Sequence, residues 1–249
     1  MKIDICLPVK NEVAILKDSI EKILQVGKVL LADHDWRLII AVNDSRDDSL
    51  LIARQLAEQE EKYLAVKAIF LPGKGRAIKS VWQESSADVL VFLDADLSVK
   101  PELLNILLGP ILKAEADLVI GSRFLSGSLC QRSWRRGLIS WSYIFLAQLF
   151  LRVKLTDLQC GFKAMTKIAF EKIKNQLWSD GWFFDTELVL LSQYNNMVIK
   201  EVPIVWQETR RGQEKSHVKL FRDSWYFFIN LLRLRWRLKI IKKKYRDSV

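Results

Sequence analysis

Short apolar runs alternate with helical stretches across the first 120 residues, and few folds accommodate that pattern. The expected strands are Ile3–Val9, Leu38–Asn43, Val66–Leu71, Val89–Asp94 and Leu118–Gly121, and the expected helices cover about 12–26, 47–61, 75–86 and 101–114. The run at 89–93 shows no polar alternation, which is typical of a parallel strand covered on both faces. Strands alternating with helices predict an α/β fold with a doubly wound, mostly parallel sheet flanked by helices. Such a sheet binds ligands beyond the carboxyl ends of its strands.

The pattern changes after Arg123. We expect a basic, aromatic helix at about 134–153, a loop and strand over Asp157–Thr166, a helix near 185–194, a strand at Val198–Trp206 and a long helix at about 219–242. We interpret residues 1–218 as one continuous domain with two halves, 1–122 and 123–218. A basic amphipathic helix and tail follow at 219–249.

The positive charge of the chain is confined to its last forty residues. Residues 210–249 contain thirteen Lys and Arg but three acids, which accounts for the whole net charge of +10 and leaves the first 209 residues neutral. The partner of this segment should therefore be a negatively charged surface. The stretch Trp225–Lys244 mixes aromatic and basic residues at helical spacing, which suits an interfacial helix on anionic lipid. A buried amphipathic helix with a basic outer face is the alternative.

Neither a membrane span nor a secretory leader is apparent. The uncharged run Leu138–Leu151 has 14 residues, whereas a membrane-spanning helix needs roughly 20. The chain opens directly into a strand rather than a signal peptide. Its three cysteines lie far apart, which favours reduced thiols in a cytoplasmic protein over disulfides or a zinc site. With two histidines in the chain, a metal would have to bind oxygen ligands.

Two carboxylates, Asp94 and Asp96, follow the uninterrupted apolar run at 89–93. At the mouth of a loop they can share the coordination of Mg²⁺ or Mn²⁺, hard cations that prefer oxygen and leave positions open for a diphosphate. An ordinary polar loop after a strand is the alternative, because D-x-D is a common sequence.

Three other segments follow expected strands. In Pro8-Val9-Lys10-Asn11-Glu12, Asn11 or Glu12 can hold a ribose hydroxyl and the amides at the helix start suit an anion, or the segment is only a helix cap. Asn43-Asp44-Ser45 can read a nucleobase edge, or make a turn and cap. Gly73-Lys74-Gly75 allows close approach to phosphate or ribose oxygens. It is neither a Walker loop nor a G-x-G-x-x-G fingerprint, which argues against an ATPase or a dinucleotide enzyme.

These four segments together resemble the family 2 glycosyltransferases of the GT-A fold, in which P-x-x-N/Y-E, D-D-x-S-x-D, G-K-G and D-x-D occur in this order. Further segments resemble the polyprenyl-phosphate branch of that family, which includes dolichyl-phosphate glucosyl- and mannosyltransferases and bacterial undecaprenyl-phosphate sugar transferases. They are Gly121–Arg123, Asp157–Lys163, Trp182–Glu187 and Val202–Trp206. The Asp157–Lys163 run is most similar to the dolichyl-phosphate glucosyltransferases. The resemblance covers roughly residues 3–240.

The resemblance implies a metal-dependent, inverting transfer of a sugar, UDP-glucose being the best-matched donor, to a polyprenyl phosphate. It implies catalytic roles for Asp94, Asp96, Arg123 and Asp157, with Mg²⁺ or Mn²⁺ on Asp94 and Asp96. The implied donor-binding residues are Pro8, Val9, Asn11, Glu12, Asn43, Asp44, Gly73, Lys74 and Ala95. The implied acceptor-binding residues are Arg123, Arg210, Arg211, Lys215 and Ser216. Residues 1–122 would then be the nucleotide-sugar half and 123–218 the acceptor half.

Several of these residues have a structural alternative. Arg123 can form a structural ion pair, and Arg210, Arg211 and Lys215 can be plain surface charge. Asp157, Asp185 and Glu187 orient sugar hydroxyls or the acceptor, or are buried acids satisfied by neighbouring groups. Lys163 offers a further positive charge or faces solvent.

The chain also departs from the family pattern around the expected nucleobase site. Lys10 stands where an aromatic residue is usual, Asn43 replaces the first aspartate, and a glycine between Asp44 and Ser45 is missing. Many relatives carry C-terminal transmembrane helices, and we expect none here. The expected location is peripheral, on the cytoplasmic face of a membrane, with a second copy or a membrane protein as a further partner.

Three other functions compete with this reading. A nucleic-acid-binding module would explain the basic tail but not the D-x-D segment or the neutral first 209 residues. A sugar-nucleotide sensor would bind the donor without turnover. A transferase could instead use a soluble glycan or protein acceptor.

Overall fold

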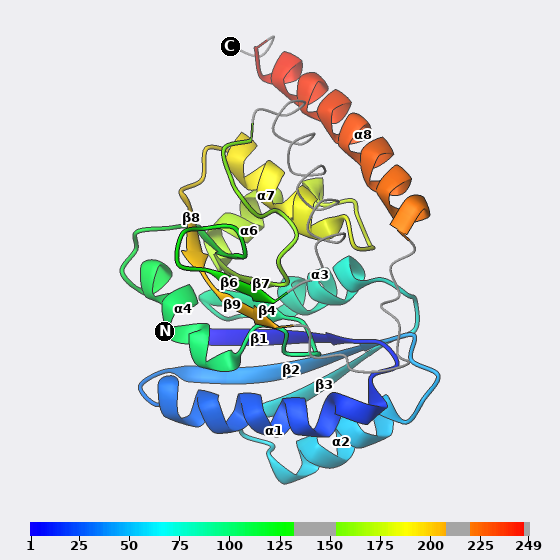
Figure 1. Ribbon diagram of the computed structural model, residues 1–249, viewed down its shortest axis with the longest axis vertical. Coiled ribbons are helices and arrows are strands. Elements are labelled where there is room, and N and C mark those ends of the chain that lie inside the picture. Colours follow the sequence, from blue (N-terminus) through cyan, green and yellow to red (C-terminus); the bar gives the residue numbers. More distant parts are fainter. Residues whose placement is uncertain (132–152, 208–219, 247–249) are drawn as a thin grey trace.

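The computed structural model describes residues 1–131, 153–207 and 220–246. Its centre is a seven-stranded sheet of order β3-β2-β1-β4-β7-β5-β8 (Figure 1). The strands are β1 Lys2–Val9, β2 Asp35–Asn43, β3 Leu64–Ile69, β4 Val89–Leu93, β5 Leu118–Ser122, β7 Phe162–Thr166 and β8 Ile199–Pro203. Strand β7 is antiparallel to both neighbours, β4 and β5, and the other pairs are parallel. The predicted mostly parallel sheet is confirmed.

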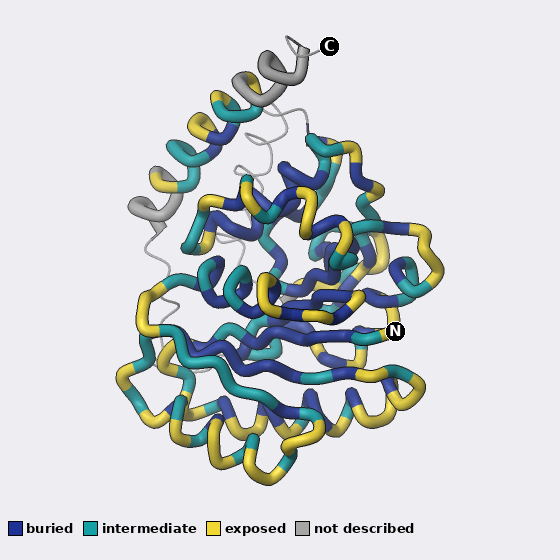
Figure 2. Tube along the Cα trace, turned by 180° about the vertical axis from the view of Figure 1, so that it is seen from behind, coloured by how far each residue is buried: buried dark blue, intermediate teal, exposed yellow. Residues whose placement is uncertain are grey.

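Helices cover both faces of the sheet, as Figures 1 and 2 show. Helices α1 Val13–Leu30, α2 Ser49–Gln59 and α4 Leu104–Leu112 cover one face, and α3 Lys74–Glu84, α6 Lys167–Ile173, α7 Phe184–Tyr194 and α8 Leu220–Arg246 lie on the other. Strand β1 shows why: Ile3, Ile5 and Leu7 belong to the first core, whereas Cys6 belongs to the second. Short 3₁₀ turns occupy Pro101–Leu103 and Lys174–Gln176.

A buried aromatic cluster joins β4 to the helices of the second face. The ring centroid of Trp82 lies 5.8 Å from that of Phe92 and 5.4 Å from that of Phe170. Phe184, the first residue of α7, lies 6.2 Å from Phe92. The Trp82 and Phe170 rings pack edge to face, and the other two pairs are tilted, which are favourable arrangements for aromatic rings. The cluster therefore fixes the last turn of α3 and the first turn of α7 against β4.

The strand expected at Val198–Trp206 is two strands. The chain leaves β8 at Ile204, whose amide bonds to the Ser128 hydroxyl and whose carbonyl accepts from Leu129. The next strand, β9 Val205–Gln207, pairs in parallel with β6 Leu129–Gln131 as a separate two-stranded sheet. Neither β6 nor α6 was predicted, and the helix expected at 134–153 lies outside the described residues.

Helix α8 packs on α7 along one face. Leu231 and Leu234 are buried in the second core, and the Tyr194 hydroxyl donates to the Leu238 carbonyl at 3.0 Å. The opposite face leaves Leu232 and Trp236 exposed. Within the described parts of the chain, no helix has the length and apolarity needed to cross a membrane.

Candidate active site

Asn43 joins three of the predicted donor-binding segments at the carboxyl edge of the sheet. Its buried side-chain amide donates to the Val9 carbonyl at 2.9 Å and accepts from the Gly73 amide at 3.1 Å. The end of β1, the end of β2 and the start of α3 are thereby held together. A direct contact of Asn43 with a nucleobase stays a prediction.

The loops after β1 and β2 are also bound to each other. Asn11, in the left-handed region at φ 54°, accepts from the Arg46 amide, and Lys10 forms an ion pair of 2.7 Å with Asp44. The hydrogen bond from Lys10 lowers the pKa of Asp44. Because these side chains bind one another, the loops after β1 and β2 have a fixed conformation at the edge of the sheet.

Two amides at the start of α1, where we expected donors for an anion, already have acceptors within the protein. The Glu12 amide donates to Ser49 Oγ at 3.1 Å, and the Val13 amide donates to Asp47 Oδ2 at 3.1 Å. The polar residues that follow β2 reach across and satisfy these donors. These two amides are therefore not available to an anion.

The D-x-D segment forms a tight turn directly after β4. The Leu97 amide donates to the Asp94 carbonyl at 3.1 Å, and the Ser98 amide donates to Asp96 Oδ1 at 3.1 Å. Ala95 is buried between the two aspartates, and its carbonyl accepts from Ser19 Oγ at 2.8 Å. Asp94 keeps 38% of its side chain exposed.

Gly161 makes room for the Asp94 carboxylate. A Cβ atom at Gly161 would lie 1.8 Å from Asp94 Oδ2, so the carboxylate could not keep its present position. The Gly161 carbonyl also accepts from the Asp94 amide at 3.1 Å. The D-x-Q-C-G-F-K run is therefore in direct contact with the D-x-D segment.

Asp94 and Asp96 fit a hard divalent cation that is shared with a ligand. Carboxylate oxygens are the ligands that Mg²⁺ and Mn²⁺ prefer. The described residues contain no group of three or more His, Cys, Asp and Glu arranged to hold a metal. Diphosphate oxygens and water would therefore have to complete the coordination shell.

Lys74 lies between two carboxylates. Its Nζ atom is 2.7 Å from Asp94 Oδ1 and 3.1 Å from Asp185 Oδ2. Burial alone would lower the pKa of Lys74, but Asp185 and Asp94 outweigh it and raise that pKa above its usual value. Lys74 therefore carries its charge at neutral pH, against the predicted metal-binding segment.

Lys163 extends this chain of charges, and the solvent-facing alternative for it is wrong. The side chain is fully buried, because β7 lies between β4 and β5, and its Nζ atom is 2.7 Å from Asp185 Oδ1. Asp185 thus binds two ammonium groups. The structure therefore agrees with the alternative in which Asp185 is a buried acid satisfied by neighbouring groups.

A loop at 177–183 covers the start of α3, a position that the sequence did not predict. The Asp180 carbonyl accepts from the Arg76 amide at 3.0 Å, and its carboxylate pairs with Arg76 at 2.6 Å. Gly73, at φ 138°, lies so close that a Cβ would meet the Asp180 carbonyl oxygen at 2.2 Å. The Trp182 ring lies 5.3 Å from Lys74 Nζ. The only sequence signal was the W-F-F-D-T-E segment, whose partners could not be read from spacing.

Arg123 and Asp157 form a buried two-point ion pair. Arg123 Nε and Nη2 lie 2.6 and 2.8 Å from the two carboxylate oxygens of Asp157. Burial alone would raise the pKa of Asp157, but Arg123 outweighs it and holds that pKa below its usual range. The pairing is the structural alternative considered for Arg123. A contact of Arg123 with an acceptor phosphate stays a prediction.

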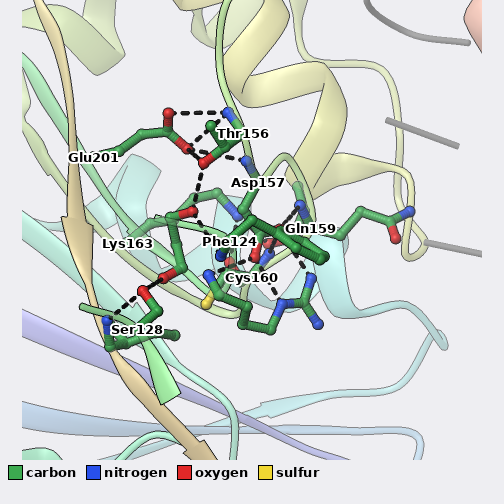
Figure 3. Close-up of polar contacts among 12 residues, drawn as sticks. Phe124, Ser128, Thr156, Asp157, Gln159, Cys160, Lys163 and Glu201 are labelled. Atoms are coloured by element: carbon green, nitrogen blue, oxygen red, sulfur yellow. Dashed lines mark hydrogen bonds and ion pairs between the residues drawn. The ribbon is translucent and has the colours of Figure 1, made fainter. Parts of the chain in front are cut away.

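Glu201 on β8 binds the backbone of Asp157 and of the residue before it (Figure 3). Its carboxylate accepts from the Thr156 amide and hydroxyl, at 2.9 and 2.8 Å, and from the Asp157 amide at 2.9 Å. Thr156 in turn shares a 2.6 Å hydrogen bond with Ser122. Glu201 was not predicted, although an acid within an apolar strand was a visible signal. The predicted acceptor residues Arg210, Arg211, Lys215 and Ser216 lie outside the described residues.

Solved structures similar to this chain share its fold. Glucosyl-3-phosphoglycerate synthase from Mycobacterium tuberculosis in complex with uridine-diphosphate has a TM-score of 0.69 at 22% identity, over 94% of this chain and 80% of that chain. The same enzyme in complex with Mn²⁺, uridine-diphosphate-glucose and phosphoglyceric acid has a TM-score of 0.70 at 21% identity, over 94% and 79%. The predicted GT-A fold class is confirmed.

Curated relatives and a family profile agree with this fold. Glycosyltransferase AglD of Haloferax volcanii is 28% identical over 96% of this chain, which spans 38% of AglD. Dolichyl-phosphate beta-glucosyltransferase of Drosophila melanogaster is 26% identical, over 98% of this chain and 79% of that protein. The profile of glycosyl transferase family 2 matches residues 4–174. This chain therefore belongs to glycosyl transferase family 2 and is a glycosyltransferase.

Proposed function

We propose that the protein transfers glucose from UDP-glucose to the phosphate of a polyprenyl lipid such as dolichyl or undecaprenyl phosphate, with inversion and with Mg²⁺ or Mn²⁺. One observation carries the proposal: the 2.7 Å contact between Lys74 and Asp94, which joins the G-K-G and D-x-D segments at the end of β4. A fixed ammonium beside two carboxylates can receive a metal-bound diphosphate. Support for the acceptor class comes from the relatives named dolichyl-phosphate beta-glucosyltransferase.

In the proposed reaction, Asp94 and Asp96 hold the cation. When bound, the cation takes up the negative charge that develops on the leaving diphosphate. An oxygen of the acceptor phosphate forms a bond to the anomeric carbon as the bond to the donor diphosphate breaks, and UDP leaves. The acceptor is already anionic at neutral pH, so this attack needs no strong general base.

Repulsion between the acceptor and donor phosphates is the remaining obstacle. Arg123 is the first candidate to counter it, with Asp157 as the residue that orients its guanidinium. Arg210, Arg211, Lys215 and Ser216 complete the proposed acceptor site. In this proposal residues 1–122 bind the nucleotide sugar, 123–218 bind the acceptor, and 219–249 contact an anionic membrane on its cytoplasmic face. A second copy or a membrane protein can bind beside it.

The donor choice rests on two kinds of likeness. The similar solved structures include complexes with UDP and with UDP-glucose, and the Asp157–Lys163 run resembles glucosyltransferases. The Lys10–Asp44 pair stands beside the expected base site, where the sequence departs from its family. We place the donor contacts on Pro8, Val9, Asn11, Glu12, Asn43, Asp44, Gly73, Lys74 and Ala95.

A donor panel with polyprenyl phosphate tests the proposal. UDP-glucose or GDP-mannose is incubated with dolichyl phosphate, undecaprenyl phosphate or a soluble glycan, in the presence of Mn²⁺, Mg²⁺ or EDTA, and the product mass is measured. We expect a lipid heavier by one hexose from UDP-glucose, with metal only. Transfer from GDP-mannose alone would overturn the donor. Transfer only to a soluble glycan would overturn the acceptor, and donor binding without any turnover would indicate a sensor.

Asp96→Ala should abolish transfer, and Asp94→Ala should do the same, while the circular dichroism spectrum stays that of the wild type. Both substitutions lie in the loop after β4, and in Asp94→Ala the buried Lys74 keeps Asp185 as its second partner. Full activity of both variants at limiting metal would contradict the metal site.

A further inference from the structure

Lys74 binds one of the two carboxylate oxygens that Asp94 could offer to a metal. Its ammonium lies 2.7 Å from Asp94 Oδ1, a charge-assisted hydrogen-bond distance. A divalent cation on the same carboxylate would stand within a few ångströms of this ammonium. Two positive charges at that separation repel strongly where water is scarce.

The surroundings hold Lys74 in this position. Asp185 binds it at 3.1 Å and is itself anchored by Lys163 at 2.7 Å. The rings of Phe92 and Trp182 lie 5.2 and 5.3 Å from Lys74 Nζ, a distance at which an aromatic ring attracts a cation. The Lys74 side chain is 7% exposed and Asp185 is 2% exposed. The ammonium is therefore a built-in part of the site rather than a mobile surface charge.

We infer that Lys74 is a tethered cation that keeps a divalent metal off Asp94 until a nucleotide diphosphate arrives, and that Asp185 is the residue that positions it. The inference rests on the proposed function and names the order in which that site fills. A diphosphate offers oxygens to the metal and the ammonium together, so its binding turns their repulsion into shared contacts. Metal and nucleotide then bind cooperatively, and their coupling depends on Lys74.

Two substitutions separate this role from a merely structural one, because they act in opposite directions. Lys74→Met removes the competing charge and keeps the apolar stem, so Mn²⁺ without nucleotide should bind about tenfold more tightly. Asp185→Asn removes a negative charge and leaves the ammonium on Asp94, so Mn²⁺ alone should bind more weakly than to the wild type. Loosening of the site would weaken Mn²⁺ binding in both variants.

The measurement is a titration of free Mn²⁺ by electron paramagnetic resonance, with the full chain, first alone and then with UDP. UDP should strengthen Mn²⁺ binding to the wild type, and by a smaller factor in Lys74→Met. Lys28→Met is the matched control, because it removes a lysine that pairs with Glu60 instead of Asp94, and it should behave as the wild type. Circular dichroism checks folding.

The outcomes distinguish this inference from the proposed function. A folded Lys74→Met variant whose Mn²⁺ affinity without nucleotide equals or falls below that of the wild type would overturn the inference. If Lys74→Met does not fold, Asp185→Asn can still overturn the inference, through Mn²⁺ binding that is unchanged or tighter than that of the wild type. Wild-type protein that binds no Mn²⁺ even with UDP would contradict the proposed function itself.

Discussion

At the scale of single residues, the stability of the fold depends strongly on the intact Arg123–Asp157 pair. Asp157 is fully buried, and its carboxylate also accepts the Gln159 and Cys160 amides at 3.0 and 3.1 Å. Asp157→Asn would leave the Arg123 guanidinium buried without its counter-charge, at a cost of about 3–5 kcal/mol of unfolding free energy. Urea unfolding at pH 7 measures it. Glu115→Gln, which removes an exposed partner of Lys200, should leave the midpoint unchanged.

The same pair predicts a pH window. The pKa of Asp157 is held below its ordinary value of 3.8 in the folded protein, although burial alone would raise it. The pair therefore contributes its full stability above the unfolded pKa and loses it as the pH falls through the lower folded pKa. The difference in urea midpoint between wild type and Asp157→Asn should be constant from about pH 7 to 5 and shrink below about pH 4. A difference that shrinks between pH 7 and 5 would contradict the lowered pKa.

The sequence predicted which edge of the sheet carries the polar residues, but not which side chains pair there. Lys74 and Asp94 were placed at one edge because the ends of parallel strands meet there. Asp185 as the second partner of Lys74 could not be foreseen, since spacing within α7 does not say which acid faces β4. The alternatives for Lys163 stayed open for a related reason, because its burial depends on β7 entering the middle of the sheet.

At the scale of elements, α8 buries leucines on one face and exposes two apolar side chains on the other, among its described side chains at 226–239. Leu231 and Leu234 pack on the core, while Leu232 and Trp236, four residues apart, are 42% and 67% exposed. Residues four apart share a helix face. A helix with only one face on the core would carry polar residues outside. The packing of α8 on the core agrees with the buried alternative, whereas contact of Leu232 and Trp236 with an anionic bilayer stays a prediction.

The outer face of α8 can be tested without removing the helix. A truncation before Leu220 would uncover the core, so Leu232→Ala/Trp236→Ala is the sharper change. Vesicles with anionic lipid should sediment the wild type, and high salt should release part of it, because the Debye length falls from about 8 Å at physiological strength to about 3 Å at 1 M. The double variant should lose the salt-resistant part and keep the wild-type unfolding midpoint. Equal sedimentation of both proteins, or none of either, would point to a protein partner instead.

The sequence predicted helices and strands correctly where the hydrophobic periodicity is strong. It failed where the partner of a strand determines its bounds. The strands expected from 3 to 121 all form, with ends shifted by up to three residues. The Val198–Trp206 run reads as one strand because its apolar pattern continues through Ile204. The break there follows from a change of partner, from β5 to β6, and no local pattern reports the partner of a strand.

At the scale of the whole molecule, a line of contacts joins α8 to the candidate donor site. Arg237 pairs with the buried Glu187 at 2.6 Å, and Glu187 accepts from the Ser179 amide at 2.7 Å. The next residue, Asp180, holds the start of α3 through Arg76. Arg237 also lies 3.6 Å from the centroid of the Trp178 ring and donates to the Gln176 carbonyl. The tail helix thus supports the loop that covers Lys74.

Arg237→Met should therefore weaken UDP binding, although Arg237 makes no contact with Lys74 or Asp94 among those described. Losing the guanidinium leaves Glu187 buried and uncompensated, so stability should also fall. Arg237→Met/Glu187→Gln removes both charges and should be more stable than Arg237→Met alone, since the two effects are coupled. Calorimetric titration with UDP and Mn²⁺, beside urea unfolding, measures both quantities. If the double variant regains stability and still binds UDP weakly, the pair positions the loop; if UDP binding is unchanged in every variant, the line of contacts is structural alone.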